Sequence, residues 1–306
     1  MMNRFFQKFT ELLVVWTVLA AVIGFVYPPA LTVFRPYLDY MFMFTMLGIG
    51  LVLNPEDFIP IIKKPYLTFL GTFTQFAVMP LAAFLVARAL RLPPELALGL
   101  IVAGAVPGAM ASNVISYLAG ADVALSIAFT TCSTFLAPVL TPVFTFLFAR
   151  MYMHVDGWAM FQSIILMVVL PLGIGLVLKR RFRTRIEKFQ SVFPAISTFF
   201  IAFICGLVVA LNKDKLAGIS VLIFAAVALL NVIGLLGGYW AGRLYGFNEK
   251  QRRTLSFEVG MQNAGLGAVL ALKHFSVEAA LPPALFATWC VITASILAGI
   301  WARNRS

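Results

Sequence analysis

The chain carries apolar runs that are too long and too free of charge for a soluble protein. Between Leu96 and Phe148 the only charged residue is Asp122. Of all 306 residues, 61% are hydrophobic and 11% are charged. Soluble domains instead average about 45–50% apolar and about 25% charged residues. Because a helix satisfies its own backbone hydrogen bonds in hydrocarbon, these runs predict an all-α, polytopic membrane protein.

Turn and charge signals divide the chain into ten apolar segments. We expect ten membrane-spanning helices, near Leu12–Tyr27, Thr32–Leu53, Tyr66–Leu90, Leu96–Leu118, Val123–Met151, Trp158–Leu178, Phe193–Leu211, Leu216–Leu244, Thr254–Leu272 and Leu281–Trp301. An even number of spans places both chain ends on one side of the membrane.

The net charge of +11 arises from basic residues that cluster in short loops between the apolar segments. With ten spans, 16 of the 23 Lys and Arg residues fall on the side of the two termini, and Lys179–Arg185 is the densest group. Positive residues are enriched in cytoplasmic loops, so this bias predicts that both termini are cytoplasmic. The same clustering in loops argues against a nucleic-acid-binding surface.

Two of the ten segments are interrupted by helix-breaking residues. In the fourth, Pro107 removes a backbone donor and Gly108 relaxes the chain beside it. The ninth has a counterpart in Glu258–Gly267, and each interrupted segment precedes a similar stretch, Phe129–Leu140 or Phe286–Leu297. Five spans followed by five more would invert the second copy. Paired interruptions in two inverted halves indicate the binding site of a secondary transporter.

Glu258 lies in the middle of the ninth segment beside the amides of Gln262 and Asn263. A carboxylate in hydrocarbon costs roughly 2.5–3.5 kcal/mol on insertion scales, so it needs a cation, a proton or hydrogen-bond donors. Carbonyl groups freed at a helix break suit a hard monovalent cation, whereas the N-terminus of the following half-helix favours an anion. We interpret Glu258 as a cation ligand; a structural salt bridge or a protonated helix–helix contact is the alternative.

Other polar side chains at membrane depth point to the same centre. Gln75 is isolated on an apolar span, and Ser126 and Thr130 share one face of the fifth span. Taken alone, such residues more often hydrogen-bond a neighbouring helix or the preceding turn. They are therefore candidate ligands only in combination with Glu258.

Two motifs make the chain recognisable. Residues 107–119, PGAMASNVISYLA, followed by Asp122–Ser126, resemble the bile acid:sodium symporter family, and so do Glu258–Leu266 and Gln75 before Met79–Pro80. The resemblance implies ten helices in two inverted five-helix repeats. Helices one, two, six and seven would form a panel domain (residues 1–60 and 157–212), and the rest a core domain (64–152 and 215–303) in which broken helices four and nine cross.

The resemblance also implies the residues of the site. One sodium ion would be held by Ser112, Asn113, Ser126, Thr130 and Glu258; a second would be held by Gln75, Glu258, Val259, Met261 and Gln262. An anion would approach Met110, Ala111 and Asn263. The chain departs from the family at Met110, where relatives carry a small polar residue, and near Cys290–Val291, where they carry a His–Asn pair.

These features together predict a sodium-coupled symporter of an organic anion that works by alternating access. The anion would be bile-acid-like or a small carboxylate such as pantoate or ketopantoate. We expect a bacterial inner-membrane location, no cofactor beyond the two coupling ions, and no obligate protein partner. A proton-coupled or efflux carrier with Glu258 as its titrating group is the alternative. A channel would need repeated polar positions along one face or an oligomeric axis, and neither is visible in the sequence. An enzyme would need a nucleophile, metal ligands or paired carboxylates at depth, where the chain has one carboxylate and no histidine beside it.

Overall fold

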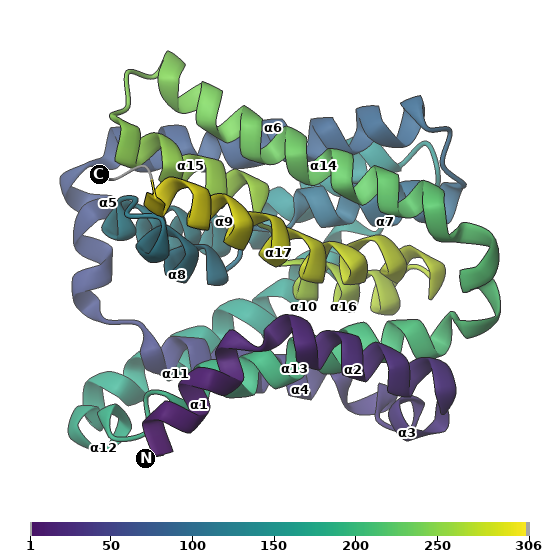
Figure 1. Cartoon of the computed structure of the whole chain (residues 1–306), viewed down its shortest axis with the longest axis horizontal. Helices are drawn as coiled ribbons and strands as arrows, with labels where there is room; N and C mark the ends of the chain where they lie inside the picture. Colours follow the sequence, from purple (N-terminus) through teal and green to yellow (C-terminus); the bar gives the residue numbers. More distant parts are fainter. Residues whose placement is uncertain (1, 304–306) are drawn as a thin grey trace.

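The computed structural model describes residues 2–303, and within that range the chain is helical with no β-strand (Figure 1). The expected all-α fold is therefore confirmed. Among the described residues, six helices are long and apolar enough to cross a membrane: Pro65–Ala89, Val123–Ala149, Gly157–Arg181, Val192–Leu211, Val221–Leu244 and Glu278–Arg303. Each coincides with one of the predicted spans. The full count of ten stays a prediction.

The other predicted spans fall on shorter or bent helices. Leu13–Val26 and Pro29–Val52 form a pair bent by 110°. The second predicted span begins in the structure at Leu38 rather than Thr32, because a 3-10 turn, Arg35–Tyr37, interrupts the chain at Pro36. Pro94–Ala105 is apolar but has only 12 residues.

The helices form two layers, which Figure 1 shows one above the other. We call them the lower and upper layers. The lower layer contains α1 (Met2–Glu11), α2 (Leu13–Val26), α3 (Pro29–Thr32), α4 (Leu38–Val52), α11 (Leu170–Arg181), α12 (Arg183–Glu187) and α13 (Val192–Leu211). The upper layer contains α6 (Pro65–Ala89), α7 (Pro94–Ala105), α8 (Ala111–Leu118), α9 (Val123–Ala149), α14 (Leu216–Leu244), α15 (Glu249–Gly260), α16 (Ala264–His274) and α17 (Leu281–Arg303).

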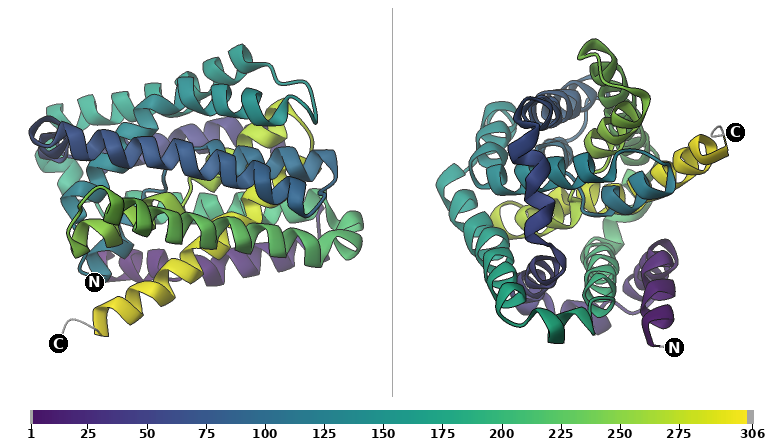
Figure 2. Two further views of the ribbon diagram at one scale, coloured as in Figure 1. Left: turned by 90° about the horizontal axis from the view of Figure 1, so that it is seen from above. Right: turned by 90° about the vertical axis from the view of Figure 1, so that its left-hand side faces the viewer.

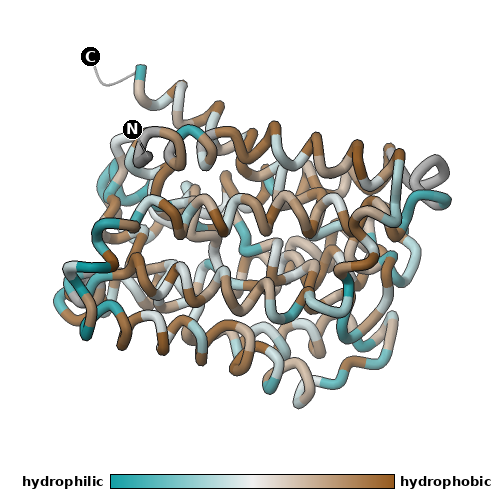
Figure 3. Tube along the Cα trace, turned by 90° about the horizontal axis from the view of Figure 1, so that it is seen from below, coloured by the Kyte–Doolittle hydropathy of each residue, from teal (hydrophilic) through white to brown (hydrophobic). Residues whose placement is uncertain are grey.

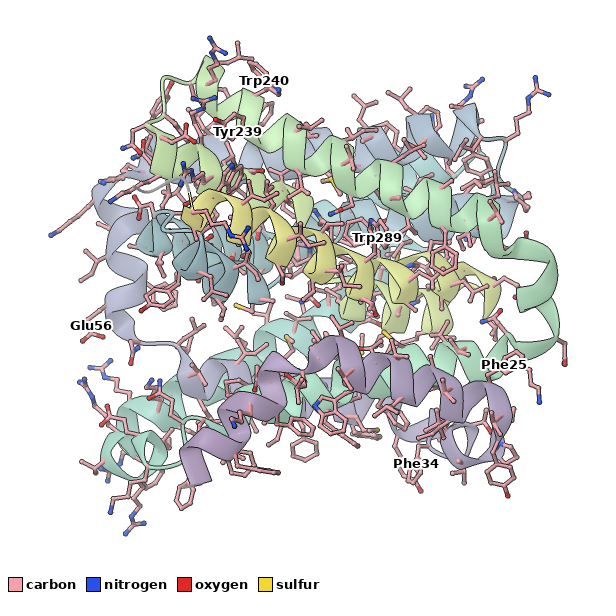
Figure 4. The ribbon with its side chains drawn as sticks, in the orientation of Figure 1. Phe25, Phe34, Glu56, Tyr239, Trp240 and Trp289 are labelled. Atoms are coloured by element: carbon pink, nitrogen blue, oxygen red, sulfur yellow. The ribbon has the colours of Figure 1, made fainter. Side chains whose placement is uncertain are left out.

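Three connections join the layers, and the last of them in the chain is the short 3-10 turn Lys213–Lys215 between α13 and α14. The short helix α5 (Ile59–Lys63) and the turn before it run along one edge, where Glu56 is labelled in Figure 4. Helix α10 (Gly157–Ile164) packs on α9 of the upper layer and continues into α11 of the lower layer through a π-helical turn, Ile165–Val169. That turn precedes Pro171, whose ring excludes a regular hydrogen bond to the carbonyl of Met167.

Small residues let the lower-layer helices approach closely. A side chain on Gly24 of α2 would overlap the backbone oxygen of Gly206 on α13, and a Cβ on Gly206 would lie 2.6 Å from Ala20 O. Close packing of small residues is the usual way in which helices associate where lipid supplies no hydrophobic driving force. The α2–α13 contact is therefore set by backbone approach.

The surface matches a protein surrounded by lipid. Hydrophilic residues gather mainly at the two ends of the helices, with hydrophobic residues along their length (Figure 3). In Figure 4, Phe25 and Phe34 lie towards one end of the molecule and Tyr239 and Trp240 towards the other. Tyr and Trp are the side chains enriched at membrane interfaces. The start of α1 and the end of α17 lie at the same end of the molecule (Figures 1 and 2).

Candidate functional site

Two broken helices meet in the upper layer. Helix α7 ends at Ala105 and α8 begins at Ala111, while α15 ends at Gly260 and α16 begins at Ala264. The breaks fall at the Pro107–Gly108 and Met261–Asn263 segments, where the backbone becomes extended at Val106 and at Met261.

The two breaks hydrogen-bond to each other. Ala109 N donates to Met261 O at 2.9 Å, and Asn263 N donates to Pro107 O at 2.8 Å. These bonds flank an antiparallel bridge between Gly108 and Gln262. Backbone groups that leave a helix must find partners where water is excluded. The crossing segments supply those partners for one another, which fixes their register.

Glu258 lies beside this crossing and is 1% exposed. Its Oε2 accepts hydrogen bonds from Ser112 Oγ at 2.8 Å and from Thr130 Oγ1 at 2.9 Å. Its Oε1 is buried without a hydrogen-bond partner. Among the described ion pairs none involves Glu258, so the structure does not support the salt-bridge interpretation.

A second group of polar atoms lies around the amides of Gln75 and Gln262. Gln75 Nε2 donates to Gln262 Oε1 at 2.6 Å, and Gln262 Nε2 donates to Val259 O at 2.8 Å. Gln75 Oε1 is buried and unpartnered. Gln75 and Gln262 are 0% and 2% exposed, so both amides are withdrawn from solvent.

The residues expected around the first sodium ion lie together, with one difference at Ser126. Thr130 Oγ1 lies 3.4 Å from both Ser112 Oγ and Asn113 Oδ1. Thr130 Oγ1 donates to the backbone oxygen of Ser126 at 3.0 Å. The hydroxyl group of Ser126 instead accepts a hydrogen bond from Ser116 Oγ at 3.3 Å. Ser126 Oγ is thus engaged with α8 rather than with Glu258.

The residues expected around the second ion combine side chains with backbone oxygens. Val259 and Met261 are both 0% exposed. Their carbonyl groups already accept bonds, from Gln262 Nε2 and Ala109 N respectively. A carbonyl oxygen has two lone pairs, so each retains one for a cation.

The three residues expected to meet the anion also lie at the crossing. Met110 and Ala111 are half-buried at the start of α8, and Asn263 is half-buried at the start of α16. Asn263 Oδ1 caps α16 by accepting from Leu266 N at 3.2 Å. A methyl group on Gly265 would lie 3.8 Å from Ile201 and 3.9 Å from Phe42. The start of α16 therefore faces α13 and α4 of the lower layer.

Asn231 is a residue of this region that sequence reasoning missed. It is 0% exposed; its Nδ2 donates to Gly260 O at 2.8 Å and its Oδ1 accepts from Thr293 Oγ1 at 2.7 Å. It thus ties the end of α15 to α14 and α17. A lone Asn within an apolar span was the available signal, because an unpaired amide is costly in hydrocarbon.

The comparisons with known proteins decide the family. Residues 40–219 match the family described as the sodium bile acid symporter family. This chain belongs to that family. The resemblance seen in the two motifs is thereby confirmed, and as a member of a sodium-dependent transporter family the chain has sodium as its implied coupling ion.

Proteins similar to this chain match it over nearly its whole length. A Bacillus subtilis (strain 168) protein described as an uncharacterized sodium-dependent transporter is 39% identical over 290 residues, 95% of this chain and 90% of that protein. A probable chloroplastic sodium/metabolite cotransporter of Arabidopsis thaliana is 35% identical over 292 residues, 95% of this chain and 73% of that protein. The names of these relatives are those of transporters, not enzymes.

Proposed function

We propose that this protein is a sodium-coupled symporter that moves an organic anion across a membrane by alternating access. This proposal is supported mainly by two buried side-chain oxygens that accept no hydrogen bond, Glu258 Oε1 and Gln75 Oε1. Both lie in the region where the two helix breaks cross. Buried polar atoms without partners are rare in folded proteins, and oxygen atoms of this kind are ligands for hard cations.

Two sodium sites share the carboxylate of Glu258. The first is formed by Ser112, Asn113, Ser126, Thr130 and Glu258, and the second by Gln75, Glu258, Val259, Met261 and Gln262. The hydroxyl groups of Ser112 and Thr130 both donate and accept, so each can turn a lone pair towards a cation. For Ser126, the hydrogen bonding favours the backbone oxygen as the ligand.

An anion completes the charge balance of the site. Two sodium ions and one carboxylate leave an excess of one positive charge, and the positive ends of α8 and α16 face the crossing. Met110, Ala111 and Asn263 lie where the anion would contact both half-helices. The substrate is bile-acid-like or a small carboxylate such as pantoate or ketopantoate.

The proposed architecture is ten spans in two inverted five-helix repeats. The order α6, broken α7–α8, α9 recurs as α14, broken α15–α16, α17. The lower layer would be the panel domain and the upper layer the core domain, with boundaries at residues 1–60 and 157–212 against 64–152 and 215–303. The start of α1 and the end of α17 lie at one end of the molecule, which supports placing both termini on one side of the membrane. The bias of positive residues makes that side the cytoplasmic face, in our proposal that of a bacterial inner membrane.

Calorimetry on the purified protein tests the coupling. Taurocholate, pantoate and ketopantoate are titrated in sodium chloride and in potassium chloride. At least one should bind in sodium with an affinity that falls at least tenfold in potassium, because each ligand raises the affinity for the other by the same factor. Glu258→Gln should remove the difference between the salts, whereas Glu187→Gln, a change at an exposed carboxylate, should not. Unchanged sodium dependence in Glu258→Gln would refute the assignment.

A proton-coupled or efflux carrier is the second candidate function, and the environment of Glu258 supports it. The carboxyl group is buried and, among the described residues, has hydroxyl donors but no cationic partner. A proton can neutralise such a group as a sodium ion can. Anion binding that is indifferent to sodium but changes with pH would select this candidate.

A further inference from the structure

We propose that α11 carries a binding site for one anionic phospholipid in the leaflet that contains the chain ends. The proposal goes beyond transport and stands on a different face of the molecule from the crossing of the broken helices. It combines an apolar groove with a basic pocket on the same helix.

The apolar half of the site is a shallow, open groove of about 510 Å³ along one face of α11 and the π-helical turn before it. It is lined by Val169, Leu170, Gly173, Ile174, Val177 and Leu178. A Cβ on Gly173 would have no atom within 4 Å, so the missing side chain opens the middle of the groove. The rise of 1.5 Å per residue makes Val169–Leu178 about 14 Å long, close to half of the ~30 Å hydrocarbon core. The groove therefore matches an acyl chain in one leaflet.

The polar half is a pocket of about 100 Å³ at the C-terminal end of the same helix, on the side next to the end of α4. Its lining combines apolar residues with three cations, Lys179, Arg180 and Arg183, and includes Leu53, Asn54 and Leu176. Gly173, Val177 and Arg180 follow the i, i+4, i+7 spacing of one helical face, so this edge of the groove leads to Arg180 at the rim of the pocket. A lipid whose chain lies in the groove would place its phosphate at this pocket.

Charge complementarity identifies the head group as anionic. Between residues 179 and 188 the chain has six cations and one carboxylate, Glu187. Glu187 pairs with Arg183 at 2.9 Å on the surface, and Glu56 also acts electrostatically on Arg183. Arg180, Arg181 and Arg185 are exposed beside this pair, so a net positive charge remains. Guanidinium groups bind phosphate through two parallel hydrogen bonds, and basic pockets at the cytoplasmic side of membrane helices bind acidic head groups.

Lys179 is a buried residue at the base of the pocket and is held in place by a hydrogen bond to α4. Its side chain is 3% exposed and its Nζ donates to Val52 O at 2.7 Å, at the end of α4. This bond holds the end of α4 against α11 and sets the pocket between them. Lys179 is therefore a positioning residue, and the exposed arginines are the groups to test.

Native mass spectrometry of the full-length protein in detergent micelles tests the site. The probes are dioleoyl phosphatidylglycerol, dioleoyl phosphatidylcholine and glycerol 3-phosphate, the last being a free phosphate without acyl chains. One phosphatidylglycerol should bind at least tenfold more tightly than phosphatidylcholine, and glycerol 3-phosphate should not displace it. The double variant Arg180→Gln/Arg183→Gln should weaken phosphatidylglycerol by about 30-fold, since each basic residue near a membrane surface contributes about 1 kcal/mol.

Two further variants separate a built site from diffuse charge. Gly173→Leu fills the groove without removing a cation or meeting a neighbouring atom, and it should weaken phosphatidylglycerol at least fivefold. Arg243→Gln/Lys250→Gln removes two exposed cations elsewhere and should leave binding unchanged. Any one of four results would overturn the proposal. These are equal affinity for the two lipids, displacement of phosphatidylglycerol by glycerol 3-phosphate, unchanged phosphatidylglycerol affinity in Gly173→Leu, and an equal loss of affinity in Arg243→Gln/Lys250→Gln.

Discussion

Glu258 Oε1 lies so close to Gly108 that a Cβ on residue 108 would overlap it. Gly108 therefore does more than break a helix. Because it has no side chain, it leaves the space into which the Glu258 carboxylate projects. This relation joins the two halves of the chain, 150 positions apart, at the oxygen that has no other partner.

Gly108→Ala should impair sodium binding while leaving the protein folded. The added methyl group forces the carboxylate or the crossing to shift, at a cost of about 1–3 kcal/mol. We expect sodium-dependent anion binding to weaken at least tenfold in calorimetry. Gly299→Ala is the control, because a Cβ there meets nothing within 4 Å. An unaltered sodium affinity in Gly108→Ala would show that the carboxylate does not use this space.

Thr130→Val should weaken sodium binding by roughly tenfold, since it removes a hydroxyl that contacts Glu258 at nearly constant side-chain volume. The matched control on the same helix is Thr141→Val. Thr141 is 0% exposed and its hydroxyl has no partner, so its removal should leave sodium binding unchanged and raise stability by about 1 kcal/mol. Sodium titrations monitored by thermal unfolding measure both effects. Equal sodium affinities in the two variants would contradict the assigned role of Thr130.

Lys273 and Asp39 form an ion pair between α16 of the upper layer and the start of α4 in the lower layer. If the layers move relative to one another during transport, this pair must break. Lys273→Met should shift the equilibrium away from the present conformation by about 0.2–1 kcal/mol, the usual range for an exposed pair.

The readout for this pair is the rate of thiol labelling at Ala111→Cys, in a background without the three native cysteines. We expect the labelling rate to change two- to fivefold in Lys273→Met, because the loss of an exposed ion pair worth up to about 1 kcal/mol shifts an equilibrium by up to about fivefold. The swap Asp39→Lys/Lys273→Asp should restore the original rate. Arg252→Gln, which breaks the pair with Glu249 within the upper layer, should have no effect. If the charge-swapped double variant had the same labelling rate as Lys273→Met, the ion pair would have no role in this equilibrium.

Gly206→Val should destabilise the lower layer. The new side chain meets Ala20 O, whose distance from a Cβ on Gly206 is 2.6 Å, and overpacking of this kind costs about 1–3 kcal/mol. We expect the Tm in detergent to fall by roughly 5 °C. Gly299→Val, in an open position, should change the Tm by less than about 2 °C. A Tm that is unchanged in Gly206→Val would mean that α2 and α13 can separate without loss of stability.

Much of this architecture follows from local chemistry that is visible in the sequence. Apolar runs without charge determine helices in a membrane, because no other structure satisfies the backbone of a single segment in hydrocarbon. Pro107 and Gly108 interrupt one helix for equally local reasons. The two motifs around Asn113 and Glu258 were specific enough to identify the family before any contact between them was known.

Contacts between distant segments required the tertiary structure. Ser126 and Thr130 share a helical face in the sequence, yet the Thr130 hydroxyl bonds Glu258 whereas the Ser126 hydroxyl bonds Ser116. Asn231 appeared as a lone polar residue, and its bonds to Gly260 and Thr293 depend on how three helices pack. Periodicity defines which face of a helix a residue occupies, whereas its partner depends on the rotation and depth of the neighbouring helix. The sequence by itself therefore determined the helices, their breaks and the family; only tertiary packing decided which oxygens meet at Glu258.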